Sequence, residues 1–162
     1  HDKCVYIYKV LDVEVSAAAN EEDEGEGGGG GGGGGEVSVE LIRKKELVNI
    51  PEAACFLDDS TTLVISVRGD NYFHYLTTTT GEVQKINMNQ MGDDHVSFTV
   101  LDLVLNPSGK LLLASTDKSR LVLFVVGSSI QMRWFYGAVN DELCQTRACW
   151  HPSGAYIFVT SQ

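Results

Sequence analysis

The stretch from residue 103 to residue 124 limits what this chain can fold into more than any other. It holds three short runs rich in Val and Leu, separated by Asn106-Pro107-Ser108-Gly109 and by Asp117-Lys118-Ser119. Proline presets a turn-forming φ, glycine reaches positive φ without a Cβ clash, and aspartate accepts hydrogen bonds from nearby backbone N–H groups. The apolar runs are too short for ordinary helices. The stretch therefore predicts three β-strands joined by two tight turns.

The same pattern recurs along the chain. Pro152 follows Pro107 by 45 residues, and Ser108-Gly109 recurs as Ser153-Gly154 at the same distance. Upstream, residues 56–66 align when Ser60 is placed on Ser108, a distance of 48 residues. A period of roughly 40–45 residues is that of a four-stranded propeller blade. The repeat predicts an all-β fold, a partial β-propeller of four-stranded antiparallel blades with about three blades visible.

Short sequences at the predicted turns resemble a known repeat family. Residues 2–8, Asp-Lys-Cys-Val-Tyr-Ile-Tyr, follow the pattern Asp-Lys-small-Val-x-aliphatic-aromatic, and residues 117–124 follow it with one extra residue, Arg120. Residues 68–76 form a third copy. This pattern resembles the end of a WD-repeat, and the resemblance covers the chain outside residues 13–36.

The sequence also departs from the WD-repeat pattern. The Trp-Asp pair is replaced by Tyr8-Lys9, Leu76-Thr77 and Phe124-Val125, and the Gly-His dipeptide is absent. The Ser–His–Asp–Trp hydrogen-bond network of such repeats therefore cannot form in its usual composition. The resemblance still implies a β-propeller that serves as a scaffold for protein–protein interactions within a complex, without enzymatic activity or a cofactor.

The repeat divides the chain into successive blades within one propeller segment, residues 1–162. Residues 1–50 are expected to end a blade and to carry an acidic, Gly-rich loop insertion at residues 12–36. Residues 51–96 and 97–141 are each expected to form a blade, and residues 142–162 to begin another. Strands are expected at residues 2–10, 37–43, 53–57, 63–67, 72–76, 83–87, 100–105, 111–115, 121–126, 131–136, 147–150 and 156–160. The segment would then be part of a longer chain or have further blades, because propellers close with typically four to eight.

The insertion accounts for the net charge of −10, since nine of the chain's 22 acids lie between Asp12 and Glu40. Nine consecutive glycines at residues 27–35 lose much entropy on ordering and offer no side chain to bury, which predicts a flexible loop. Glu36 follows the glycines where a phosphate-binding loop has Lys, so nucleotide binding is excluded. A solvated low-complexity loop is the preferred interpretation, with docking on a basic partner as the alternative.

Composition argues against several classes of partner. The 12 basic residues are scattered and the chain is acidic, so direct nucleic-acid binding is not expected. No apolar run approaches the roughly 20 residues that a membrane span needs, and no signal-peptide pattern opens the chain. The chain is therefore expected to be intracellular, cytoplasmic or nuclear, and to bind other proteins.

Few residues suggest chemistry. Cys144, Cys149 and His151 could supply three metal ligands, but no CxxC pair is present, so the cysteines are interpreted as buried reduced thiols. Asp58-Asp59 is expected to form a turn. His74, which alternates with aromatic residues in a strand, is expected to be packed or half-exposed.

An enzyme of a different class is the alternative function. Propeller enzymes, such as lactonase-like hydrolases, place acidic, His or Arg residues at the ends of the inner strands, around a central channel. The predicted inner strands of this chain offer Asp102, Arg147 and His151. Three residues of this kind make a weaker case than the repeat makes for a scaffold.

Recognition residues usually lie in loops on a rigid scaffold. In a propeller of this connectivity, the turns between second and third strands share one face with the links between blades. That face predicts a protein-binding site, with the candidates Arg68, Asp70, Asn71, Asp117, Lys118, Arg120, Asn140 and Asp141. A second group of candidates is aromatic and consists of Trp134, Phe135, Tyr136 and Trp150. Packing between blades is the preferred role of this group, and recognition of a partner protein is the alternative.

Overall fold

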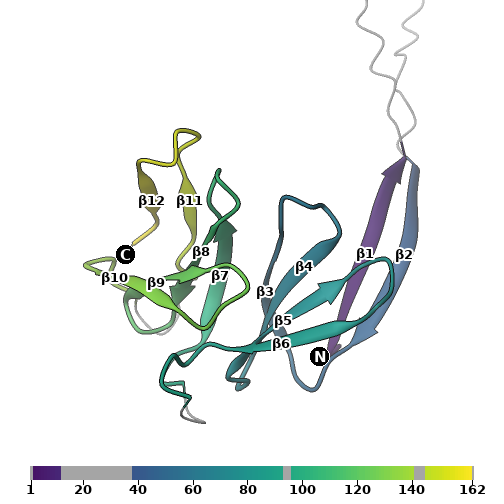
Figure 1. Ribbon diagram of the computed structural model, residues 1–162, viewed down its shortest axis with the longest axis horizontal. Helices are drawn as coiled ribbons and strands as arrows, with labels where there is room; N and C mark the ends of the chain where they lie inside the picture. Colours follow the sequence, from purple (N-terminus) through teal and green to yellow (C-terminus); the bar gives the residue numbers. More distant parts are fainter. Residues whose placement is uncertain (1, 12–37, 93–95, 141–144, 162) are drawn as a thin grey trace, which may run out of the picture. The chain divides into compact units, whose positions relative to one another are not determined.

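Two four-stranded antiparallel sheets make up most of this computed structural model, which describes residues 2–11, 38–92, 96–140 and 145–161 (Figure 1). In both sheets the strands lie side by side in sequence order. The first sheet consists of β3 (Pro51–Phe56), β4 (Thr62–Val67), β5 (Tyr72–Thr77) and β6 (Val83–Asn87). The second consists of β7 (Val100–Leu105), β8 (Leu111–Thr116), β9 (Arg120–Val125) and β10 (Gln131–Tyr136).

Two further pairs of strands complete the described structure. The pairs are β1 (Cys4–Leu11) with β2 (Ser38–Glu46), and β11 (Ala148–Trp150) with β12 (Ile157–Val159). Every predicted strand is present, and the described residues contain no helix, so the predicted all-β class is confirmed. No membrane-spanning helix is found in the part of the chain that the structure describes. The predicted insertion at residues 12–36 lies outside the described residues.

The contacts divide the chain into two compact units, one of residues 1–5 and 45–162 and one of residues 6–44. In the smaller unit, the Tyr6 and Tyr8 rings of β1 stack with centroids 6.5 Å apart, and the Lys44 ammonium lies 5.2 Å from the Tyr6 centroid. These contacts add to the backbone pairing of the two-stranded ribbon. The single propeller segment inferred from the sequence stays a prediction.

A hydrophobic cluster joins the two four-stranded sheets of the larger unit. β3 lies beside β7, and Val64 and Phe73 of the first sheet belong to one buried cluster with Leu112 and Phe124 of the second. The Phe73 and Phe124 rings meet edge to face with centroids 5.1 Å apart. Phe73 and Phe124 are each only 1% exposed, so their contact lies at the centre of the interface between the sheets.

The opposite face of the second sheet is buried as well. Leu113, Leu121 and Leu123 pack against Trp150 and Ile157 of the β11–β12 pair, and β7 lies beside β11. Successive residues of β8 therefore serve two different interfaces, because strand side chains alternate between the two faces of a sheet. A strand covered on both faces needs a nearly continuous apolar run, which explains the sequence Leu-Leu-Leu-Ala at residues 111–114.

The structure corrects one of the repeat distances. In each turn between first and second strands, one N–H bonds back to the carbonyl three residues earlier: Ser60 to Leu57, Gly109 to Asn106, and Gly154 to His151. The repeats are thus 49 and 45 residues apart, and the predicted distance of 48 is wrong by one. Ser60, with φ of 55°, occupies the left-handed position held by Gly109 and Gly154, with φ of 70° and 72°.

The register of the sheets agrees with this distance. β3 has an irregularity between Pro51 and Ala53, and β7 has the same irregularity between Val100 and Asp102. Val100 follows Pro51 by 49 residues, and Asp102 follows Ala53 by the same distance. The three corresponding hairpins point the same way (Figure 1). The sheets are therefore equivalent in detail as well as in strand order.

Candidate functional site

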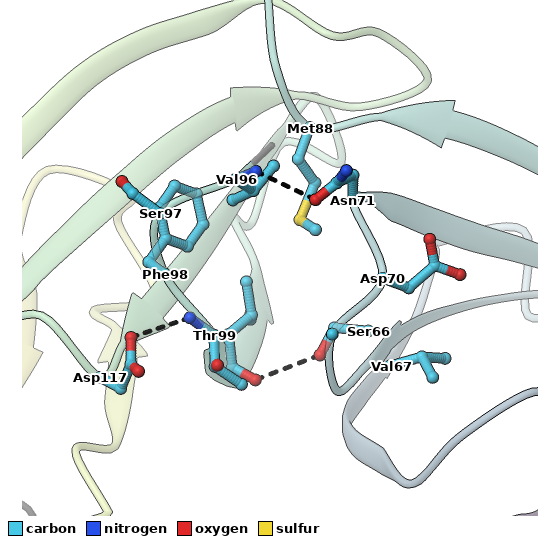
Figure 2. Close-up of a pocket in the computed structure, with 12 residues that line it drawn as sticks. Ser66, Val67, Asp70, Asn71, Met88, Val96, Ser97, Phe98, Thr99 and Asp117 are labelled. Carbon is cyan, nitrogen blue, oxygen red and sulfur yellow. Dashed lines mark hydrogen bonds between the residues drawn. The ribbon is translucent and has the colours of Figure 1, made fainter. Parts of the chain in front are cut away.

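A pocket of about 310 Å³ lies between the two four-stranded sheets at one edge of the larger unit (Figure 2). It is bounded by the β4–β5 turn, by residues 96–99 of the link between β6 and β7, and by Asp117 in the β8–β9 turn. Three predicted binding residues, Asp70, Asn71 and Asp117, line it. The structure thus brings together residues that are up to 47 positions apart in the sequence.

Two of these side chains fasten the link to the turns. Asn71 Oδ1 accepts a hydrogen bond from the Val96 N–H at 3.0 Å, and Asp117 Oδ1 accepts one from the Thr99 N–H at 2.8 Å (Figure 2). Beneath them, Ser66 Oγ donates to the Val100 carbonyl at 3.2 Å. The predicted binding residues therefore have a structural role, since they position the loop around the pocket.

Asp70, which lines the pocket, also belongs to a polar cluster with His74 and Lys85. Its Oδ2 lies 2.7 Å from His74 Nε2 and 3.5 Å from Lys85 Nζ, and its Oδ1 accepts the Tyr72 N–H at 3.2 Å. Partial burial opposes ionisation, but the His74 hydrogen bond, with help from Lys85, outweighs it and lowers the Asp70 pKa. His74 is 3% exposed, so its packing within the strand is as predicted, whereas its pairing with Asp70 was not foreseen.

The Asp70 cluster should make stability depend on pH in the acid range. Because the folded pKa of Asp70 is lowered, its carboxylate stabilises the native state above the unfolded pKa of about 3.9. That stabilisation is lost as the pH falls through the folded pKa. We expect Asp70→Asn to flatten the fall in unfolding free energy below about pH 4, measured by urea denaturation across a pH series. Asp58→Asn controls for the change in net charge, and equal pH profiles for wild type and Asp70→Asn would refute the assignment.

Arg120 is held between two aromatic rings. Its guanidinium carbon lies 4.5 Å from the Trp134 ring centroid and 5.1 Å from that of Phe98, and Nη2 donates to Ser97 Oγ at 2.9 Å. Stacking of this kind orients a guanidinium and removes part of its hydration. Arg120 thus also fixes Ser97 and Phe98 of the link between β6 and β7.

The remaining predicted residues differ in how free their side chains are. Arg68 and Lys118 are more than half exposed, with Arg68 paired to Glu52 and Lys118 3.8 Å from Asp117. The Asn140 N–H donates to Ser119 Oγ at 2.9 Å, and its side chain donates to the Thr116 carbonyl, so it holds the β8–β9 turn. Asp141 lies outside the described residues. Arg68 and Lys118 are therefore the candidates best placed to contact a partner.

The four aromatic residues of the second candidate group have two different environments. Phe135 and Trp150 pack against the cluster between the second sheet and the β11–β12 pair, which agrees with the preferred packing role. Trp134 and Tyr136 instead face outward, with exposed fractions of 39% and 70%. Neighbouring residues of β10 thus have different roles because alternate side chains lie on opposite faces.

The residues of the alternative enzyme have structural partners. Asp102 Oδ1 pairs with Arg147 Nη1 at 3.2 Å, and Oδ2 accepts the Ala148 N–H at 2.9 Å, which ties β7 to β11. His151 follows the other end of β11 and has Nδ1 2.8 Å from Ser153 Oγ within its turn. Both oxygens of Asp102 are therefore occupied, and Arg147 and His151 flank opposite ends of one strand.

The other candidate chemistry is placed as follows. Asp59 caps its turn by accepting hydrogen bonds from the hydroxyl and N–H of Thr62 and from the N–H of Thr61. These hydrogen bonds, first of all the one from the Thr62 hydroxyl, lower the pKa of Asp59. Cys149 is exposed, contrary to the expectation of a buried thiol. Cys144 lies outside the described residues. Among the residues that the structure does describe, no group of three or more His, Cys, Asp or Glu side chains could hold a metal ion.

Comparisons with known proteins give no assignment. No protein-family model matches the sequence, and no curated protein proves similar to it. The resemblance to WD-repeats stays a prediction, and the function has to be argued from the geometry.

Proposed function

We propose that this chain forms successive blades of a WD-repeat-like β-propeller and acts as a scaffold that binds other proteins. Three features support the propeller. The repeats are equivalent at distances of 49 and 45 residues, and the first strands β3, β7 and β11 lie side by side in that order. The second sheet is covered on both faces, as a blade between two neighbours would be.

The observation that carries the binding function is the loop edge around the 310 Å³ pocket. Hydrogen bonds from the Val96 and Thr99 N–H groups to Asn71 and Asp117 hold residues 96–99 in place, so this part of the surface is fixed before a partner arrives. A preorganised loop loses less entropy on binding than a mobile one. Arg68 and Lys118 each have a neighbouring carboxylate, but more than half of each side chain is exposed, so both cations can still meet an acidic partner surface.

The hydrolase alternative receives less support. Asp102 would be the inner-strand acid, yet both of its oxygens hold β11 in place. A general base has to reach its substrate's proton by a direct hydrogen bond or through one water. The scaffold is therefore the function that the geometry favours.

Affinity capture with matched variants tests the proposal. The tagged chain is expressed in cells, and co-purifying proteins are compared by quantitative mass spectrometry for wild type, Arg68→Glu, Lys118→Glu and Lys110→Glu. Lys110 is exposed in the β7–β8 turn, away from the pocket, and serves as the control. We expect a reproducible set of proteins to be lost about tenfold with Arg68→Glu or Lys118→Glu, because reversed charges oppose each other at the interface.

Two outcomes would contradict the proposal. One is that no protein is enriched over a tag-only control. The other is that all three variants behave like wild type, which would place binding elsewhere. Thermal unfolding of each variant separates loss of binding from loss of folding, since surface changes normally alter stability by less than about 0.5 kcal/mol.

A further inference from the structure

Strand β10 lies at the end of its sheet and carries an exposed aromatic patch. Its only strand partner is β9, so one row of its N–H and C=O groups has no neighbouring strand in the described structure. The Trp134 and Tyr136 rings lie on one face with centroids 6.4 Å apart. Tyr136 pairs in register with Arg120, so the stacked guanidinium belongs to the same face.

Two cations at this edge have no carboxylate partner among the described residues. Arg133 is exposed on β10, and neither Arg120 nor Arg133 forms an ion pair with any described residue. Arg120 donates from Nη2 to Ser97, but its buried Nε makes no hydrogen bond to any residue that the structure describes. A buried donor without an acceptor is costly, and a guanidinium pairs best with a carboxylate that accepts two hydrogen bonds.

A hollow of about 280 Å³ lies beside the same aromatic face. Met91, Phe98, Gln131 and Trp134 are among the residues that line it. Gln131 Oε1 accepts from Trp134 Nε1 at 2.7 Å, and its Nε2 donates to the Met88 carbonyl at 2.8 Å. These two bonds hold the indole in place, so the hollow has a fixed wall for an apolar side chain.

We propose that β10 binds an extended segment of a partner protein, which adds a strand to this edge and carries an acidic and an apolar side chain two residues apart. The inference rests on the proposed protein-binding function and names the chemistry of one partner. Backbone hydrogen bonds to β10 supply affinity, as in other cases of strand addition. Side chains two residues apart lie on the same face of the added strand, so one enters the hollow while the next, an acid, reaches Arg120.

The charges and the aromatic residues select this occupant. A carboxylate over Arg120 gains a charge-assisted hydrogen bond in a setting already partly desolvated by Phe98 and Trp134. Trp, Tyr and Arg are also the residues that most often dominate binding energy at protein interfaces. A basic segment would be repelled by Arg120 and Arg133, and a wholly apolar one would leave both unpaired.

The test uses the full chain and three short peptides of about seven residues. The first has glutamate and leucine in turn at every second position, with threonine between them, so that both kinds of side chain lie on one face, and it carries a fluorescein label. The second has glutamine in place of every glutamate. The third repeats the first with N-methyl groups on alternate amides, which block strand pairing. Binding is measured by fluorescence anisotropy, and by Trp134 emission in a Trp150→Phe background.

We expect the glutamate peptide to bind and the other two to bind at least about tenfold more weakly, a loss of about 1.4 kcal/mol. Arg120→Met should weaken the glutamate peptide by a similar factor, since methionine keeps contact with both rings but loses the charge. Lys110→Met removes a cation from the β7–β8 turn and should leave binding unchanged. The peptide changes leave the protein untouched, so they remain informative even if Arg120→Met unfolds.

Equal binding of the glutamate and glutamine peptides would overturn the acidic specificity, and equal binding of the N-methylated peptide would overturn strand addition. Self-association of the free chain that Arg120→Met abolishes would also overturn the proposal, in favour of a second copy as occupant. If partner capture depends on Lys118 while no peptide binds β10, the scaffold function is retained and β10 is rejected as the binding site. Peptide binding without any captured partner would reject the scaffold function alone.

Discussion

Replacing Phe124 with alanine should lower the free energy of unfolding by about 3–5 kcal/mol. Phe124 is 1% exposed and meets Phe73 edge to face in the cluster that joins the two four-stranded sheets. The substitution removes the apolar area of a whole ring and leaves a cavity that strands on both sides are too rigid to fill. Urea denaturation followed by circular dichroism measures the change.

Tyr136→Ala is the matched control for Phe124→Ala. It also removes a ring from the second sheet, but Tyr136 is 70% exposed, and the expected change is within about 0.5 kcal/mol. A double-mutant cycle with Phe73→Ala should give a coupling of about 0.5–1.5 kcal/mol for the ring pair. A Phe124→Ala variant as stable as Tyr136→Ala would show that the two sheets do not pack as described.

Replacing Asp102 with alanine should loosen the β11–β12 pair and cost about 1–3 kcal/mol. Asp102 accepts the Ala148 N–H at 2.9 Å and pairs with Arg147, so its removal leaves a backbone donor without an acceptor at the start of β11. Most of the expected loss is assigned to that N–H, because the Arg147 side chain is 56% exposed and its ion pair is screened by water.

Amide hydrogen exchange locates the effect of Asp102→Ala. Protection of the Ala148 N–H should fall about tenfold or more, while protection in β4 and β5 stays as in wild type. Asp102→Asn keeps an oxygen for this N–H and should lose less protection than Asp102→Ala. Uniform loss of protection across both four-stranded sheets would mean that Asp102 supports the whole fold instead of one junction.

The positions of the strands could be predicted because local chemistry determines them. Short Val- and Leu-rich runs are separated by turn residues with a specific backbone role, such as Gly109 and Gly154 at positive φ. The repeat distance failed where that chemistry is less visible. Ser60 adopts φ of 55° without being glycine, so an alignment of serine on serine placed the upstream turn one residue out of step.

The roles of the candidate site residues were harder to predict, because they depend on contacts between distant segments. Asn71 and Asp117 were chosen as exposed turn residues, yet their side chains hold the backbone of Val96 and Thr99. The pairing of His74 with Asp70 depends on how the β4–β5 turn places the Asp70 carboxylate next to the His74 ring in β5. The outward position of Trp134 and the inward position of Phe135 follow from strand alternation, which the sequence did show.

The sequence-ordered arrangement of the strands has a consequence for how the chain folds. Each strand of the two four-stranded sheets pairs with its immediate successor through a short hairpin, so closing these contacts costs little chain entropy. The contacts between sheets join more distant positions, such as Phe73 and Phe124, which are 51 residues apart, and cost more. Each sheet can therefore assemble from its own residues, and docking of finished sheets through rings such as Phe73 and Phe124 becomes the late and slower step. Folding of this kind proceeds by addition of whole units, and damage to one junction leaves the sheets on either side able to form.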